Sequence, residues 1–214
     1  MFQDDRARLN DDDDDDDEEP ACPEHDQKKG GGHGDSLGMR LLKHRTIVIA
    51  KPVDKELMER VSTQLLLLSA ENSSKPITVY VNSPGGDADS GFAIYDVMKF
   101  VRAPVRTVCA GLCASAAIII FLGSEKGQRF SLPNSRFLIH QPSTQAMGQA
   151  SDLEITAKEI IKIREKYNEV VAAETGVSAK QVIKDANRDF WLSADEAKSY
   201  GLVSKIVKEM GEIE

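Results

Sequence analysis

Cysteine is scarce in this sequence, which has three among 214 residues. Cys22, Cys109 and Cys113 form no obvious disulfide framework, and two of them lie in apolar segments, as is typical of a reducing compartment. Long hydrophobic runs are absent as well, because the longest, around 114–122, is far short of the roughly 20 residues that span a bilayer. We therefore expect a cytoplasmic protein without a membrane partner.

Basic residues are few at the N-terminus, where a transit peptide would need them and would contain little acid. Residues 1–20 instead hold eleven acidic side chains against Arg6 and Arg8, a local charge of −9. Because the whole chain carries −8, the remaining residues together carry only +1. Such a nearly neutral body lacks the basic surface that binds nucleic acid, so we expect no nucleic-acid partner.

The N-terminal segment combines this aspartate run with a glycine-rich stretch and contains few apolar side chains that could be buried. We predict that residues 1–38 form a disordered tail and that residues 39–214 form one folded domain. Cys22, His25 and His33 match no zinc spacing well, and the aspartate run lacks the glycine and glutamate of an EF-hand loop. We therefore predict neither a metal site nor another cofactor.

From Leu41 onwards, apolar segments of strand and helix character alternate. Asp54 is placed to cap a helix whose apolar residues recur at helical spacing, namely Leu57, Val61, Leu65 and Leu68. The pattern further predicts strands at 46–50, 77–81 and 105–110, and helices at 89–101 and 114–122. Alternation of this kind is typical of βαβ units, so the predicted fold class is α/β with a parallel sheet.

Capping boxes mark three helix starts in the C-terminal part: Ser151 with Glu154, Ser178 with Gln181, and Ser193 with Glu196. The first opens a long helix, roughly 152–174, whose apolar side chains lie on more than one face. We expect the second face of this helix to be buried against another subunit.

The candidate chemistry centres on Ser115, which is expected just inside an apolar helix that follows a strand and a glycine turn. A serine nucleophile needs an imidazole base, a carboxylate that orients the imidazole, and N–H donors for the developing oxyanion. His140 and Asp189 can serve as base and carboxylate. Gly86 can supply one N–H because no Cβ blocks its approach, and Ala116 a second from the first helical turn.

Each of these residues also has a simpler interpretation when it is taken alone. Ser115 is small enough to let a helix pack close to a sheet, and His140 is placed at a strand end. Arg188–Asp189 is typical of a surface ion pair. Their joint occurrence with Gly85–Gly86 is what favours catalysis.

Several motifs in register support the catalytic interpretation: Asn82-Ser-Pro-Gly-Gly86, Gly111-Leu-Cys-Ala-Ser115-Ala, Leu132-Pro-Asn-Ser-Arg136, Ile139-His-Gln-Pro142, Gly148-Gln-Ala-Ser-Asp-Leu-Glu-Ile155, Arg188-Asp189 and Leu192-Ser-Ala-Asp-Glu-Ala197. Together they resemble the ClpP serine peptidase family from about Leu41 to Val207. The separations also agree, with 25 residues from Ser115 to His140 and 49 from His140 to Asp189.

The resemblance implies a ClpP/crotonase-like fold and a serine endopeptidase, the proteolytic subunit of an ATP-dependent Clp protease. In this family Ser115, His140 and Asp189 would form the triad, and Gly86 and Ala116 the oxyanion hole. The subunits would form heptameric rings stacked as a tetradecamer, a barrel in which unfolded proteins are cut to small peptides. A handle at about 141–174, with 143–150 as its strand and turn, would interlock the rings, and an AAA+ Clp-type unfoldase would be the partner.

Departures from the family pattern bear on two of these expectations. The acidic tail stands where the family has a partly apolar pore segment that contacts the unfoldase. This difference argues against docking of a standard Clp unfoldase. The residues around the serine also differ, with Leu112, Cys113 and Ala116 in place of the expected Gln, Ala and Met. We therefore expect a shifted substrate preference. Two alternatives stay open: a structural subunit that co-assembles with an active paralogue, and an acyl-CoA enzyme on the crotonase fold.

Overall fold

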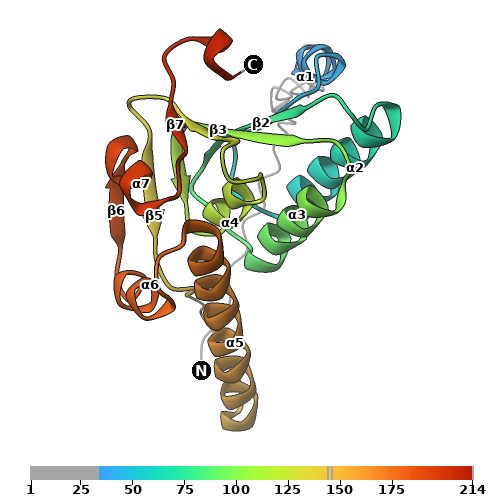
Figure 1. Ribbon diagram of the computed structural model, residues 1–214. Coiled ribbons are helices and arrows are strands. Elements are labelled where there is room, and N and C mark those ends of the chain that lie inside the picture. Colours follow the sequence, from blue (N-terminus) through green and yellow to red (C-terminus); the bar gives the residue numbers. More distant parts are fainter. Residues whose placement is uncertain (1–33, 144, 146, 214) are drawn as a thin grey trace, which may run out of the picture.

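The structure is a computed structural model that describes residues 34–143, 145 and 147–213 (Figure 1). Its helices are α1 Gly34–Lys43, α2 Lys55–Glu71, α3 Ala88–Phe100, α4 Ala116–Leu122, α5 Ala150–Thr175, α6 Ala179–Asp185, α7 Ala194–Tyr200 and the short 3₁₀ helix Met210–Ile213. Its strands are β1 Thr46–Ile49, β2 Ile77–Ser83, β3 Val105–Ala114, β4 Arg129–Ser131, β5 Arg136–Ile139, β6 Phe190–Ser193 and β7 Lys205–Ile206. The α/β class is thus as predicted.

Five strands form a parallel sheet in the order β1-β2-β3-β4-β7. β3 is longer than the predicted 105–110, because its second half continues past a kink at Gly111, where φ is 121°, and pairs with β5. β6 then pairs with β5 in the antiparallel direction. β3 is therefore the strand that joins the main sheet to the small β5–β6 layer.

The core lies between this sheet and helices α2, α3 and α4, which cover one of its faces (Figure 1). The four residues predicted for the inner face of α2 are all buried, and the side chain of Asp54 caps that helix by accepting from the Leu57 N–H. Every residue of α4 is buried as well. A helix packed on all sides moves as one unit, so the position of α4 sets the position of Ser115, which directly precedes it.

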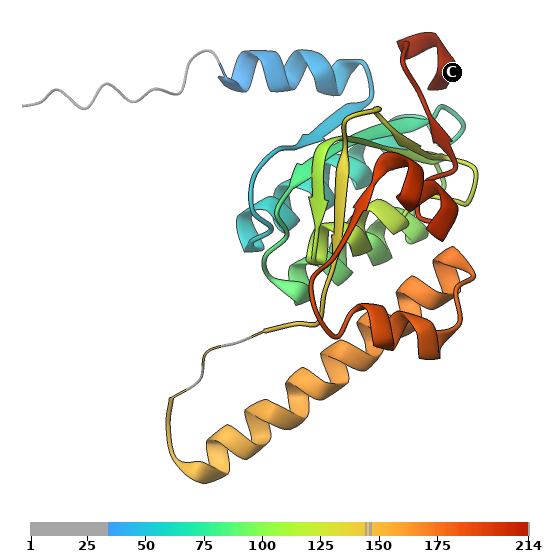
Figure 2. The same cartoon turned by 90° about the vertical axis from the view of Figure 1, so that its left-hand side faces the viewer.

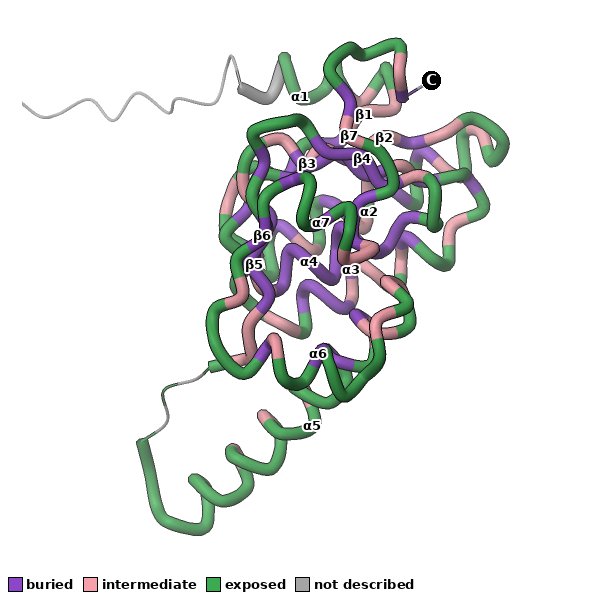
Figure 3. The backbone as a smooth tube through the Cα atoms, turned by 60° about the vertical axis from the view of Figure 1, so that its left-hand side comes forward, coloured by how far each residue is buried: buried purple, intermediate pink, exposed green. Residues whose placement is uncertain are grey.

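Helix α5 projects from the body of the molecule, and its N-terminal half is exposed (Figures 2 and 3). Its buried residues are confined to the C-terminal third: Tyr167, Asn168 and Val171. Leu153, Ile155 and Ile161 stay exposed on the projecting part. The predicted long helix is therefore present, and most of its apolar surface lies outside the core of this chain.

Several predicted boundaries were wrong. α5 begins at Ala150 with Gln149 at the N-cap position, so Ser151 lies inside the helix and the predicted box with Glu154 does not form. Ser178 caps α6, but only Ser193 and Glu196 form a complete capping box. The described residues of 143–150 that precede α5 form no strand, since none of them pairs with a neighbouring strand.

The N-terminal boundary also differs from the prediction. Helix α1 begins at Gly34, inside the segment assigned to the tail, and Leu42 near its end packs against the core. This partly buried side chain attaches the C-terminal end of α1 to the folded domain. Residues 1–33 lie outside the described residues, so the disordered tail stays a prediction. Within the described residues, no helix has the length and apolar character that a bilayer crossing demands.

Candidate active site

Ser115 occupies the sharp turn between β3 and α4 and caps the helix, so it lies before α4 and not just inside it. Its φ of 56° and ψ of −124° belong to a conformation that side-chain-bearing residues rarely adopt. Two hydrogen bonds hold it there: the Ser115 N–H donates to Leu138 O over 3.0 Å, and the Ile118 N–H donates to Ser115 O over 2.9 Å. Such a strained turn is a feature of functional sites.

The turn formed by Ala114, Ser115 and Ala116 is closely packed against glycines from two other segments. A Cβ on Gly85 would lie 2.5 Å from Ala114 O and 2.6 Å from Ser115 Cβ. A Cβ on Gly91, in α3, would lie 3.1 Å from Ala116 Cβ. Gly85 therefore leaves no room for a Cβ beside the Ser115 turn, and Gly91 allows a tight approach of α3 to Ala116.

The N–H of Gly86 is oriented by a short parallel bridge. Val53 N–H donates to Gly85 O and Asp87 N–H donates to Val53 O, each over 2.8 Å. In such a bridge the N–H of the residue between them, Gly86, points away from Val53. Among the described residues neither this N–H nor that of Ala116, the first residue of α4, has a hydrogen-bond acceptor. Both donors are therefore available to a ligand.

Strand register brings His140 next to Ser115. Ala114 of β3 pairs with Leu138 of the parallel strand β5, so the residues that follow each strand end leave the sheet at the same edge. Ser115 and His140 both line one cavity of about 390 Å³, together with Gly86 and Ala116. No hydrogen bond joins the Ser115 and His140 side chains within the part of the chain that is described.

Register also places Asp189 beside His140. Ile139 pairs with Phe190 across the antiparallel β5–β6 ladder, so the next residues outward, His140 and Asp189, lie opposite each other. His140 Nδ1 is 3.4 Å from Asp189 Oδ1, longer than the 2.7–2.9 Å typical of a charge-assisted hydrogen bond. Asp189 does not line this cavity but lines a neighbouring pocket to which His140 also contributes. The five predicted residues are therefore gathered at one place.

The rest of the cavity is mainly apolar. Its wall includes Phe92 from α3, Ile119 from α4, and Ile160 and Ile163 from α5. These side chains come from helices far apart in the sequence, and they surround the space next to Ser115. A mainly apolar cavity beside a hydroxyl, an imidazole and two free N–H groups can bind an acyl group with an apolar substituent.

Tyr167 is a cavity residue that the sequence analysis missed. Its hydroxyl donates to Ser115 O over 3.5 Å, and burial raises the pKa of that hydroxyl far above its usual range. The contact spans 52 residues, and the only signal in the sequence was the place of Tyr167 among the apolar positions of the long helix. A hydroxyl that stays protonated is a donor at every pH the protein meets.

Cys113, two residues before Ser115, is fully buried. Burial raises the pKa of its thiol well above the ordinary value, so it does not compete as a nucleophile. The weak zinc candidates Cys22, His25 and His33 lie outside the described residues. Within the described ranges, no group of three His, Cys, Asp or Glu side chains could hold a metal ion.

Comparisons with known proteins show the family of the chain. Residues 29–210 match the family model "Clp protease". The chain is 47% identical over 188 residues to the ATP-dependent Clp protease proteolytic subunit 2 of Treponema denticola, a match that covers 88% of this chain and 94% of the relative. It is 45% identical over 190 residues to the proteolytic subunit 3 of Rhizobium johnstonii, covering 89% of this chain and 97% of that one.

A solved structure of a ClpP1 point mutant from Listeria monocytogenes superposes with a TM-score of 0.77 at 44% sequence identity. The match covers 83% of this chain and 99% of that one, so the similarity extends over nearly the whole folded part. The ClpP-like fold expected from the motifs is thereby confirmed. The chain belongs to the Clp protease family.

Proposed function

We propose that this chain is a serine endopeptidase, the proteolytic subunit of an ATP-dependent Clp-type protease. The observation that supports the proposal is the strand register: Ser115 and His140 follow the paired ends of β3 and β5 and line one cavity, and His140 lies opposite Asp189 across β5–β6. A hydroxyl, an imidazole and a carboxylate in this order are the parts of a serine nucleophile, and the two free N–H groups beside them suit an oxyanion.

In the proposed mechanism, Ser115 Oγ attacks the scissile carbonyl while His140 Nε2 takes its proton. Asp189 accepts from the Nδ1–H of His140 and stabilises the imidazolium that forms. The N–H groups of Gly86 and Ala116 donate to the carbonyl oxygen as it becomes negative. His140 then gives the proton to the leaving amine, and water hydrolyses the acyl-enzyme by the same route.

The side chains of Ser115, His140 and Asp189 must move closer together when the substrate binds. His140 and Asp189 are 3.4 Å apart, and catalytic hydrogen bonds of this kind tighten in the substrate complex. Occupation of the cavity by an apolar side chain of the substrate would supply binding free energy for that closure. We therefore expect preference for an apolar residue on the acyl side of the cleaved bond.

The proposal includes assembly into heptameric rings stacked as a tetradecamer through the 141–174 handle. Apolar residues exposed on the projecting half of α5, such as Ile155 and Ile161, support it, because their burial against a second ring is favourable. An AAA+ Clp-type unfoldase would feed unfolded proteins to this barrel. The free, buried thiols of Cys109 and Cys113 favour a cytoplasmic location.

A fluorophosphonate probe, which phosphonylates only activated serines, tests this function. The purified parent should be labelled at Ser115 and should cleave a fluorogenic peptide with an apolar acyl-side residue. Ser115→Ala should lose labelling and cleavage, and His140→Ala should lose nearly as much, because triad members act as a unit. Ser74→Ala, a change at an exposed serine, is the matched control and should behave as the parent.

Absence of fluorophosphonate labelling in a correctly assembled parent would refute the proposed function. That result would favour the structural-subunit alternative, in which the site is present but does not react. Labelling with no peptide cleavage but with turnover of an acyl thioester would favour the crotonase-type alternative.

A further inference from the structure

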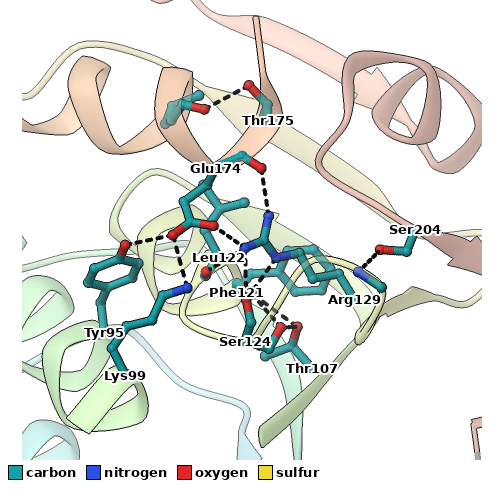
Figure 4. A network of polar contacts seen from close by, with 12 residues as sticks. Tyr95, Lys99, Thr107, Phe121, Leu122, Ser124, Arg129, Glu174, Thr175 and Ser204 are labelled. Carbon is teal, nitrogen blue, oxygen red and sulfur yellow. Dashed lines mark hydrogen bonds and ion pairs between the residues drawn. The ribbon is translucent and has the colours of Figure 1, made fainter.

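A largely buried network of ion pairs and hydrogen bonds joins α3, the C-terminal end of α4 and the C-terminal end of α5 (Figure 4). Its centre is Arg129, the first residue of β4, which is 1% exposed. Arg129 forms an ion pair with Glu174, in the last turn of α5. Glu174 in turn accepts from the Tyr95 hydroxyl over 2.8 Å and from Lys99 Nζ over 2.9 Å, both on α3.

Arg129 also binds the end of α4. Its Nη2 donates to Leu122 O, in the last residue of that helix, over 3.0 Å and to Ser124 O over 2.7 Å. Carbonyl oxygens at the C-terminal end of a helix have no hydrogen-bond donor within the helix. Because Leu122 and Ser124 are buried, water cannot supply that donor, and the guanidinium of Arg129 does so instead. Arg129 Nη1 donates to Glu174 O over 2.9 Å. One guanidinium therefore fastens the C-terminal ends of α4 and α5 together.

Helices α4 and α5 are also in contact through the residues seven positions before Leu122 and Glu174, which are Ser115 and Tyr167. Glu174 and Leu122 share Arg129 at one end, and at the other the hydroxyl of Tyr167 donates to Ser115 O. The segments 115–122 and 167–174 therefore run in the same direction and are held at both ends. Because α4 is rigid, a shift of its C-terminal end relative to α5 would move Ser115 relative to the cavity wall that α5 supplies.

Glu174 is the residue that this arrangement depends on most. A guanidinium cannot lose its proton in a protein, so a buried arginine needs a carboxylate beside it. Without the negative charge of Glu174, Arg129 and Lys99 would face each other as two cations with no counter-charge from α5. The guanidinium would then be drawn toward other acceptors and away from the end of α5.

We propose that Glu174 is a positioning residue for Ser115, acting through Arg129 on helix α4. The role rests on the proposed serine peptidase function, but the alignment of α4 with α5 can be measured independently of activity. Removal of the carboxylate should loosen α4 and slow the reaction of Ser115, even in protein that remains folded and assembled.

The decisive comparison is Glu174→Gln against Glu169→Gln, which makes the same change at an exposed position of the same helix. In Glu174→Gln, well below its unfolding temperature, the maximal rate of phosphonylation at Ser115 should fall about tenfold, because small misplacements of reacting groups are costly. Hydrogen exchange of the amides in 116–122 should become faster. Glu169→Gln should match the parent in both measurements.

Two further variants test the same proposal if the Glu174→Gln protein does not fold. Lys99→Gln and Tyr95→Phe each remove one partner of Glu174 and keep its contact with Arg129, so smaller changes in the same direction are expected, about threefold in labelling. A Glu174→Gln protein with a lower unfolding temperature but parental exchange and labelling would overturn the proposal, since its role would then be only structural. If the parent itself is not labelled, the proposed function fails, and the exchange of 116–122 still decides the role of Glu174.

Discussion

Tyr167 Oη lies 3.5 Å from the backbone carbonyl oxygen of Ser115, so the projecting helix α5 touches the residue that we propose as the nucleophile. The same helix supplies Ile160 and Ile163 to the cavity wall. Any displacement of α5, including one imposed by a neighbouring ring, would therefore reach both the nucleophile and the substrate-binding space.

Replacing Tyr167 with phenylalanine removes the hydroxyl and keeps the ring that lines the cavity. We expect a loss of stability of about 0.5 kcal/mol, since the hydrogen bond is long, and a lower kcat with little change in KM. Tyr200→Phe is the control, because it loses a hydrogen bond to Asp185 of 3.0 Å away from the cavity. Equal kcat values for parent and Tyr167→Phe would show that this contact has no effect on the serine.

Gly85→Ala should lower both the stability of the protein and the reactivity of Ser115, whereas a strained φ alone should lower only the stability. Gly85 and Gly127 both have positive φ, 86° and 92°, but an added Cβ would meet the Ser115 turn at Gly85 and open space at Gly127. Both alanine variants should lose about 1–3 kcal/mol for the strained φ. Only Gly85→Ala should also lose fluorophosphonate labelling, and equal labelling of the two variants would contradict this account.

Ring stacking through α5 can be tested without altering the cavity. Ile160 and Ile163 line the cavity and are unsuitable for this test, whereas Ile161 is 44% exposed. Ile161→Glu should yield single rings or smaller species by size-exclusion chromatography with light scattering, because the charge would be buried in the ring interface. A parental sedimentation profile for Ile161→Glu would argue against stacking through this face.

The Glu174 network should make stability depend on acid pH. Burial alone would raise the pKa of Glu174, but hydrogen bonds from Lys99, Arg129 and Tyr95 outweigh it and hold that pKa below its ordinary value of 4.5. A depressed pKa stabilises the folded state above the unfolded-state pKa, and this contribution is lost as pH falls through the lower, folded-state value. The difference in unfolding free energy between parent and Glu174→Gln should thus be constant above about pH 5 and shrink toward pH 3.

Urea unfolding of both proteins at fixed protein concentration measures this difference, and the subtraction removes the contribution of other carboxylates. A difference that is the same at pH 3 and pH 7 would mean that Glu174 carries no charge-dependent stabilisation.

The acidic N-terminal segment is expected to repel acidic substrates if it lies over the axial entrance of a ring. A charge of −9 per subunit would be repeated around that entrance, and salt would screen it, since the Debye length is about 10 Å at 0.1 M. Deletion of residues 1–33 should raise cleavage of an acidic unstructured protein at low salt and leave a neutral dipeptide substrate unaffected. Equal rates on the acidic protein at every salt concentration would favour a solubilising extension instead.

Much of this protein could be predicted from local sequence patterns. The apolar spacing of α2 predicted its four buried residues, and the Ser193–Glu196 box predicted the start of α7. The residue types required by serine catalysis, set in motifs at characteristic spacings, predicted the family. Such signals are local, because helical periodicity and capping depend on neighbours only a few residues away.

The positions of the site residues relative to one another depended on pairing between distant strands. Only the β5–β6 register shows that His140 faces Asp189, and only the close packing against the Ser115 turn shows why residue 85 is glycine. The link from Arg129 to Glu174 spans 45 residues, and no periodicity in the sequence indicates it. The sequence by itself thus determined the elements, the chemistry and the family, whereas the tertiary structure decided which distant side chains meet, because such contacts form only when the whole core packs.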